Sequence, residues 1–212
     1  MERRKTEIDW TLPPFSRGIR GLLERVAGPG VTNGELALQI LLPLLAAALA
    51  YFHTANGPSY STARLILAAV LGFDIAGGVI TNSTSSAKRW YHRAGQGFWH
   101  HSGFIALHLI HLALVWYFFD LELWWLPLQS VFLLIAASIV LLVPLHVQRP
   151  ISLTLYAIAL VATVNQSSVP GLEWFLPLFY LKLLVAHLPV EEPYRPVSRK
   201  QTEPGAGPEM PG

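Results

Sequence analysis

Apolar residues run in long, nearly uncharged stretches that short polar segments separate. A bilayer core about 30 Å thick requires roughly 17–25 mostly apolar residues from each helix that crosses it. The stretches that approach or meet this length are Leu36–Phe52, Thr62–Thr81, Trp99–Phe119, Leu123–Val143, Ile151–Val169 and Leu172–Leu188. The pattern therefore predicts an all-α, polytopic membrane protein with six transmembrane helices, of which the first, fifth and sixth carry the weakest signal.

A different periodicity precedes the first span. Five apolar residues recur at helical spacing, and at about 100° per residue they form one stripe. They are Phe15, Ile19, Leu22, Leu23 and Val26, with Arg17, Arg20, Glu24 and Arg25 outside the stripe. The pattern predicts an amphipathic helix that lies in the membrane interface with its arginines at lipid phosphates. The alternative is a helix that packs on the loops of the protein itself.

The basic residues indicate how the spans are oriented. Of 15 Lys and Arg residues, 13 fall before the first span, in the second and fourth connections, or in the C-terminal segment. The opposite side holds only Arg64, and Lys182 lies inside the sixth span. Because cytoplasmic segments are enriched in Lys and Arg, both termini are expected in the cytoplasm. Residues 1–34 then form a cytoplasmic segment with the amphipathic helix, residues 35–189 the six-helix domain, and residues 190–212 a disordered cytoplasmic tail.

Composition agrees with a membrane protein and narrows the chemistry. Charged residues make up only 13% of the chain, against roughly 25% in a soluble domain. The absence of cysteine excludes a disulfide scaffold, a thiolate metal site and a cysteine nucleophile. The expected partner is the lipid bilayer; no nucleic-acid partner is expected, and a homo-oligomer is compatible with the chain.

Histidines form a stripe on the third span. With about 100° and 1.5 Å per residue, His100, His101, His108 and His111 project within an arc of about 100° and climb roughly 16 Å. Neutral imidazole is the commonest transition-metal ligand, so the candidate metal ligands are His101, His108 and His111, with His187 from the sixth span. A divalent Zn, Fe or Mn ion is the expected cofactor. The alternative at the helix end is interfacial histidine bound to loop groups or lipid phosphate.

Two charged residues lie within the predicted spans. Asp74 is about seven residues, or roughly 10 Å, from the cytoplasmic end of the second span, too deep for its short side chain to reach water. Lys182 lies at similar depth in the sixth span, where its long stem either reaches the interface or pairs with Asp74. Gly78, one turn beyond Asp74, permits close approach of another helix. Asp74 and Lys182 are therefore the candidate catalytic residues.

The second cytoplasmic connection combines hydroxyl groups with cations. Its sequence TNSTSSAKRWYHR offers Lys88, Arg89 and Arg93 beside several Ser and Thr residues. Such a set can hold a phosphate or an anionic lipid headgroup. The alternative is an ordinary positively charged loop whose Ser and Thr residues cap helix ends.

These candidates favour a metal-dependent membrane enzyme that acts on a lipid or another membrane-soluble substrate, with the metal activating water or oxygen. No HExxH motif occurs. The alternatives are a small transporter or proton-relay protein, a haem protein, and a structural membrane protein whose polar residues form an internal hydrogen-bond network.

Overall fold

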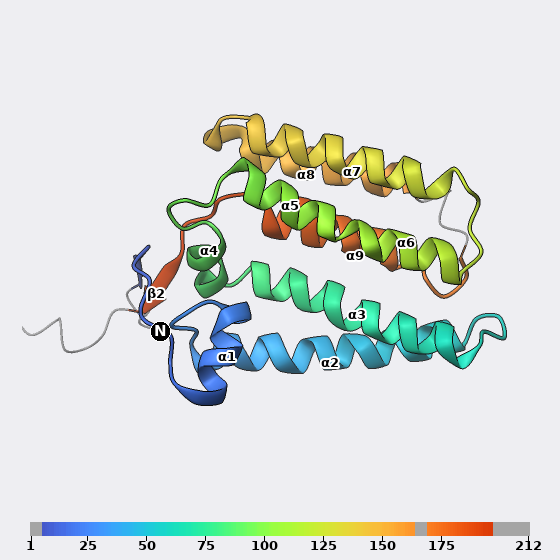
Figure 1. Cartoon of the computed structure of the whole chain (residues 1–212), viewed down its shortest axis with the longest axis horizontal. Coiled ribbons are helices and arrows are strands. Elements are labelled where there is room, and N and C mark those ends of the chain that lie inside the picture. Colours follow the sequence, from blue (N-terminus) through green and yellow to red (C-terminus); the bar gives the residue numbers. More distant parts are fainter. Residues whose placement is uncertain (1–5, 164–168, 197–212) are drawn as a thin grey trace, which may run out of the picture.

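The computed structural model describes residues 6–163 and 169–196, and nearly all of the regular structure in them is helical. Figure 1 shows the long helices running side by side along the longest axis of the molecule. In chain order the elements are β1 (Thr6–Ile8), α1 (Gly18–Ala27), α2 (Asn33–Ala55), α3 (Thr62–Asn82), α4 (Ser85–Tyr91), α5 (Phe98–Leu107), α6 (Leu109–Phe118), α7 (Trp125–Leu142), α8 (Leu145–Thr163), α9 (Phe175–Tyr180), the π-helix η1 (Leu181–His187) and β2 (Tyr194–Pro196).

Five helices in the described part of the chain are long and apolar enough to cross a membrane: α2, α3, the continuous pair α5–α6, α7 and α8. This supports the prediction of a polytopic membrane protein. The helix predicted over Ile151–Val169 begins earlier, at Leu145, and residues 164–168 of that prediction lie outside the described residues. Pro150 lies inside α8, beyond its first turn, and cannot donate the usual helix hydrogen bond to the residue four positions before it.

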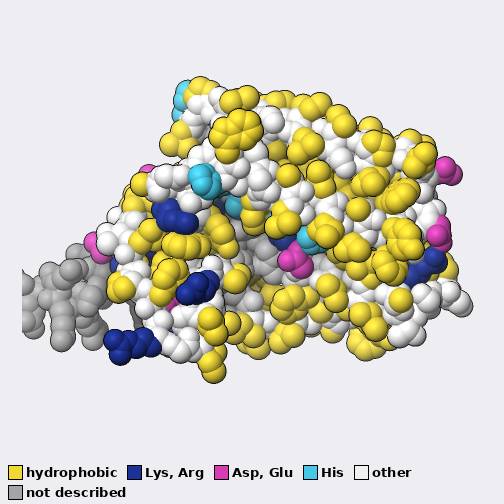
Figure 2. All heavy atoms as spheres, in the orientation of Figure 1, with side chains coloured by type: hydrophobic (Ala, Val, Ile, Leu, Met, Phe, Trp, Pro, Cys, Tyr) yellow, Lys and Arg dark blue, Asp and Glu magenta, His cyan; other side chains and the backbone are white. Residues whose placement is uncertain are grey.

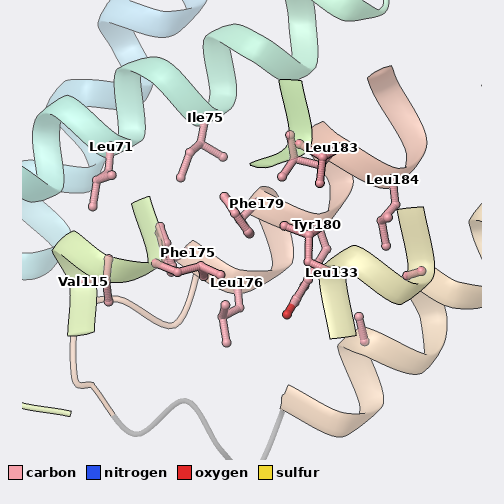
Figure 3. Packing of buried hydrophobic residues seen from close by; sticks show 14 of the residues in the cluster. Leu71, Ile75, Val115, Leu133, Phe175, Leu176, Phe179, Tyr180, Leu183 and Leu184 are labelled. Carbon is pink, nitrogen blue, oxygen red and sulfur yellow. The ribbon is translucent and has the colours of Figure 1, made fainter. Parts of the chain in front are cut away.

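The sixth predicted span has a different character. It forms six residues of α9 followed by seven of η1, a shorter apolar helix than the other five. Its large side chains point inward and pack against α3, α6 and α7, as Figure 3 shows. The fully buried members include Phe175, Leu176, Phe179, Tyr180, Leu183 and Leu184. This stretch is therefore apolar because it forms the centre of the bundle, and hydropathy does not distinguish that environment from lipid.

The two described chain ends meet at one end of the bundle. Strand β1 pairs antiparallel with β2, so that Glu7 lies opposite Arg195. Figure 1 shows α1, α4 and β2 at this same end, hereafter the chain-end side. Residues 194–196 belong to the segment predicted to be a disordered tail, and they are held by this pairing. The remainder of the predicted tail, residues 197–212, lies outside the described residues.

Helix α1 forms as the periodicity predicts, with its apolar stripe directed away from the protein. Ile19 is 78% exposed and Leu22 is 65% exposed, whereas Glu24 is only 1% exposed. The Glu24 carboxylate accepts hydrogen bonds of 2.7 Å from both the backbone N–H and the hydroxyl of Ser16. Burial raises the pKa of Glu24, but the hydrogen bonds from Ser16 outweigh this and hold it below its usual range. Helix α1 thus contacts the protein through Gly21, Glu24 and Ala27, whereas Ile19 and Leu22 remain exposed.

Candidate functional site

Asp74 of α3, His111 of α6 and Lys182 of η1 meet inside the bundle, and we call these three residues the carboxylate centre. The Asp74 Oδ2 atom lies 2.6 Å from Lys182 Nζ and 2.9 Å from His111 Nε2. Lys182 Nζ also lies 3.3 Å from the Asp74 carbonyl oxygen. Figure 2 shows acidic, basic and histidine side chains together midway along an otherwise apolar face. The ion pair between Asp74 and Lys182 that their similar depth suggested is therefore present.

Local backbone features bring Lys182 to this position. A Cβ atom added at Gly78 would lie 2.2 Å from Lys182 Cε, so the lysine stem passes over α3 only because residue 78 is glycine. Lys182 also lies at the start of the π-helical segment, whose wider turns are frequent at functional sites. The group that approaches α3 closely at Gly78 is thus the side chain of Lys182, from η1.

The three members differ in their exposure. The side chain of Lys182 is 3% exposed and that of His111 is 16% exposed, whereas that of Asp74 is 46% exposed. A charged group on a membrane-facing surface is costly, and such groups usually pair or mark a functional site. The carboxylate is thus fixed by two internal partners and remains accessible to a further group.

The hydrogen bonds of His111 determine which protonation states suit this geometry. Its Nε2 faces the Asp74 carboxylate, and its Nδ1 lies 3.2 Å from the carbonyl oxygen of His108. Both partners are acceptors, and only the doubly protonated ring donates from both nitrogens. A neutral ring can donate to only one of these two oxygens, so the geometry offers an acceptor to either ring nitrogen.

His108 interrupts the predicted regular helix. The α5–α6 boundary lies at His108, where the N–H groups of His108 and His111 each bond three residues back, to Ile105 and His108. The His108 ring stacks on that of His111 with centroids 5.1 Å apart, and its Nδ1 donates to the Phe104 carbonyl oxygen over 2.7 Å. The helix is therefore tightened locally at His108, whose ring packs on His111 while its Nδ1 bonds the backbone.

A second group of histidines lies toward the chain-end side, and we call His92, His101 and His187 the chain-end histidines. His101 Nδ1 lies 3.2 Å from His187 Nε2, and the His92 ring stacks on His101 at 4.8 Å. His92 Nε2 donates to the His187 carbonyl oxygen over 2.9 Å. Burial, and then the nearby Lys88 ammonium, lower the pKa of His92 to about 3. These contacts suit neutral rings.

His92 is the member of this group that the sequence did not single out as a site residue. It precedes the turn that leads into α5, and only the three-dimensional path of residues 92–97 places it on His101. The predicted topology supplied a partial signal, because it places the second connection, which holds His92, on the cytoplasmic side, where the third span begins with His101.

The predicted metal ligands do not form one site. Within residues 6–163 and 169–196, no three His, Asp or Glu side chains come together in an arrangement that could hold an ion. His101 and His187 are neighbours. His108 and His111 form a separate pair, and three of their four ring nitrogens lie within hydrogen-bond distance of protein oxygens. His100, the remaining member of the stripe, is exposed.

The three cations expected to hold an anion point in different directions. Lys88 Nζ donates to the carbonyl oxygens of Ala186 and Pro189 over 2.7 and 2.8 Å, and so closes the end of η1. Arg93 stacks over Trp90, 3.7 Å from the ring centroid. Arg89 is 2% exposed, and burial lowers its pKa.

A pocket of about 460 Å³ adjoins Lys88 on the chain-end side. Lys88 and Arg149 contribute cations to it, but Glu191 and Glu192 contribute anions. The mixed charge of this pocket does not single out an anionic ligand.

Comparison of the chain with models of known protein families, with curated proteins and with solved structures gives no match.

Proposed function

We propose that this chain is a membrane-embedded proton relay, acting alone or as the proton-coupled part of a small transporter. The observation that carries this proposal is the shared Asp74 oxygen, 2.6 Å from Lys182 and 2.9 Å from His111, in a side chain that is still 46% exposed. Intramembrane Asp, Lys and His residues in contact are typical of proton relays and substrate sites. A metal-dependent enzyme is a weaker candidate, because no three His, Asp or Glu side chains among the described residues are arranged so that they could hold one ion.

The charges of the centre suit proton transfer. Asp74 and Lys182 neutralise each other when both are ionised, so the charge of the centre then follows the protonation of His111. A neutral His111 that carries its proton on Nδ1 keeps the hydrogen bond to the His108 carbonyl oxygen and presents the lone pair of Nε2 beside Asp74. Nε2 then accepts a proton from a group that reaches the exposed Asp74 carboxylate and returns it by the same contact.

The route toward the chain-end side is interrupted by one aromatic ring. Phe104 stacks against His187 with ring centroids 3.9 Å apart and against His108 at 4.3 Å. It thereby separates the carboxylate centre from the chain-end histidines. Transfer between the two groups requires displacement of Phe104 or entry of water beside it.

The proposal includes a topology of six crossings with both termini in the cytoplasm. Pairing of β1 with β2 requires an even number of crossings between them, which α9–η1 supplies if it counts as the sixth. The exposed apolar face of α1, with Ile19 and Leu22, then lies in the cytoplasmic interface. Reporter fusions after Asn56 and Leu121 are expected outside, and fusions after Gly95 and Gly212 inside.

Proton flux into liposomes that contain the full-length protein tests the relay directly. A potassium diffusion potential drives protons, and an internal pH-sensitive dye reports their entry. The wild-type chain is expected to exceed protein-free liposomes, and both Asp74→Asn and the double variant Asp74→Asn/Lys182→Met are expected to lose at least tenfold. Asp120→Asn is the matched control, because Asp120 is 75% exposed in a loop beyond the bundle. Equal flux through wild-type protein and both Asp74 variants would reject the proposal.

A further inference from the structure

An apolar groove of about 360 Å³ lies where α2, α3 and α9 meet. Apart from His53 at one end, its lining is apolar or glycine: Ala46, Leu49, Ala50, Gly72, Trp174 and Leu178. The small residues shape it, because a Cβ atom at Gly72 would lie 2.6 Å from the Ala50 Cβ. Helices α2 and α3 therefore approach each other closely and leave a channel beside Leu49.

The groove extends about half-way through a bilayer. Ala46, at its deep end, lies nine residues before the end of α2 at Ala55, which corresponds to about 14 Å at 1.5 Å per residue. The hydrocarbon core measures about 30 Å. The depth of the groove thus matches a single leaflet, the one on the side opposite the chain ends.

The mouth of the groove carries one group of each charge. His53 Nε2 lies 3.0 Å from Glu173 Oε2, and the two side chains are 59% and 55% exposed. Trp174 lines the groove beside them and donates its indole N–H to the Gly171 carbonyl oxygen over 3.1 Å. Tryptophan with one polar and one apolar contact is typical of the headgroup level of a bilayer.

We propose that this groove binds one acyl chain of a phosphatidylethanolamine molecule, with its headgroup at His53 and Glu173. The amine of such a headgroup complements Glu173, and its phosphate can accept a hydrogen bond from the His53 ring. Phosphatidylglycerol lacks the amine, and Arg64, the cation on this side within the described chain, is paired with Asp120. The inference rests on the membrane location of α2 and α3 and is independent of the proton relay.

Native mass spectrometry of the full-length protein in mild detergent tests the site. The protein is titrated with phosphatidylethanolamine or with phosphatidylglycerol of the same chain composition. The wild-type chain is expected to retain one phosphatidylethanolamine, with at least tenfold weaker retention of phosphatidylglycerol. Ala46→Phe fills the deep end of the groove and is expected to reduce retention at least tenfold; Leu49→Trp, at an exposed position, gives the same loss without touching the contact between α2 and α3.

Matched variants control for each part of the site. Ala48→Phe adds the same ring on α2 at an exposed position outside the groove and is expected to retain the lipid. The double variant His53→Ala/Glu173→Ala is expected to abolish the preference between the two lipids, whereas Arg64→Ala/Asp120→Ala preserves it. Equal retention in Leu49→Trp and Ala48→Phe would show only annular lipid and overturn the site. Equal binding of both lipids to the wild-type chain would overturn the headgroup assignment.

Discussion

Lys182 reaches Asp74 by crossing α3 at Gly78, where the stem of the lysine occupies the position that a Cβ atom would take. The ion pair therefore depends on the glycine, because the absence of a side chain at residue 78 leaves space for the long side chain of Lys182.

Replacing Gly78 by alanine is expected to destabilise the protein. The added methyl would lie 2.2 Å from Lys182 Cε and force the lysine or the helix to move, and such overpacking typically costs about 1–3 kcal/mol. Unfolding in mixed micelles with increasing SDS measures the change. Gly103→Ala, in α5, is the control, because no atom lies within 4 Å of its added Cβ. That variant is expected to be neutral or more stable by about 0.5–1 kcal/mol; a similar response from both variants would contradict the crossing at Gly78.

The exposure of the two partners predicts an asymmetric mutant cycle. Asp74→Asn leaves the ammonium of Lys182 buried without its counter-charge, whereas Lys182→Met leaves a carboxylate that is half-exposed and still bonded to His111. Asp74→Asn is therefore expected to destabilise the protein more, by about 2–4 kcal/mol, and the double variant less than Asp74→Asn alone. The same SDS unfolding assay applies. Additive losses would show that the two groups do not depend on each other.

The sequence allowed the Asp74–Lys182 pair to be predicted because depth along two helices is a matter of residue counting. The contacts between histidines could not be predicted by counting residues. A tight turn interrupts the regular helix at His108, and the loop before α5 places His92 on His101. The metal site was predicted from histidine spacing on one helix, but ligation depends on ring-nitrogen direction, which spacing does not determine.

Burial is a second property that the sequence leaves open. The periodicity of α1 identifies an apolar stripe but does not show that Glu24 is buried, with its carboxylate bonded to Ser16. The hydropathy of the stretch around Phe179 suggests a span but does not show that neighbouring helices cover its side chains. Periodicity and hydropathy describe one segment at a time, whereas burial depends on the segments around it.

Removal of the Phe104 ring is expected to accelerate proton flux. This ring lies between His187 and His108, with centroid distances of 3.9 and 4.3 Å, and excludes other groups from the space between them. In Phe104→Ala, water can occupy this space, so we expect a severalfold increase in the liposome assay. Phe98→Ala, in the first turn of α5, controls for loss of an aromatic ring from the same helix. A decrease in Phe104→Ala with unchanged folding would show that the ring supports the route.

The last prediction concerns stability in acid. Burial, and next the Lys88 ammonium, lower the pKa of His92 from 6.5 to about 3. The folded protein therefore binds fewer protons at His92 than the unfolded chain does between these two values. Stability follows the difference in bound protons, so this residue makes the protein less stable as the pH falls from about 6.5 toward 3.

His92→Gln should flatten that dependence. The glutamine amide can still donate to the His187 carbonyl oxygen, which His92 Nε2 meets at 2.9 Å, but it does not titrate. Thermal unfolding in detergent between pH 7 and pH 4 is expected to show a steeper loss of stability for the wild-type chain than for His92→Gln. His146→Gln is the control, since His146 is exposed. Parallel curves for wild type and His92→Gln would mean that His92 binds protons equally in the folded and unfolded protein, which would contradict the neutral rings inferred for His92 and His101. An equal flattening by His146→Gln would show that the effect is not specific to His92.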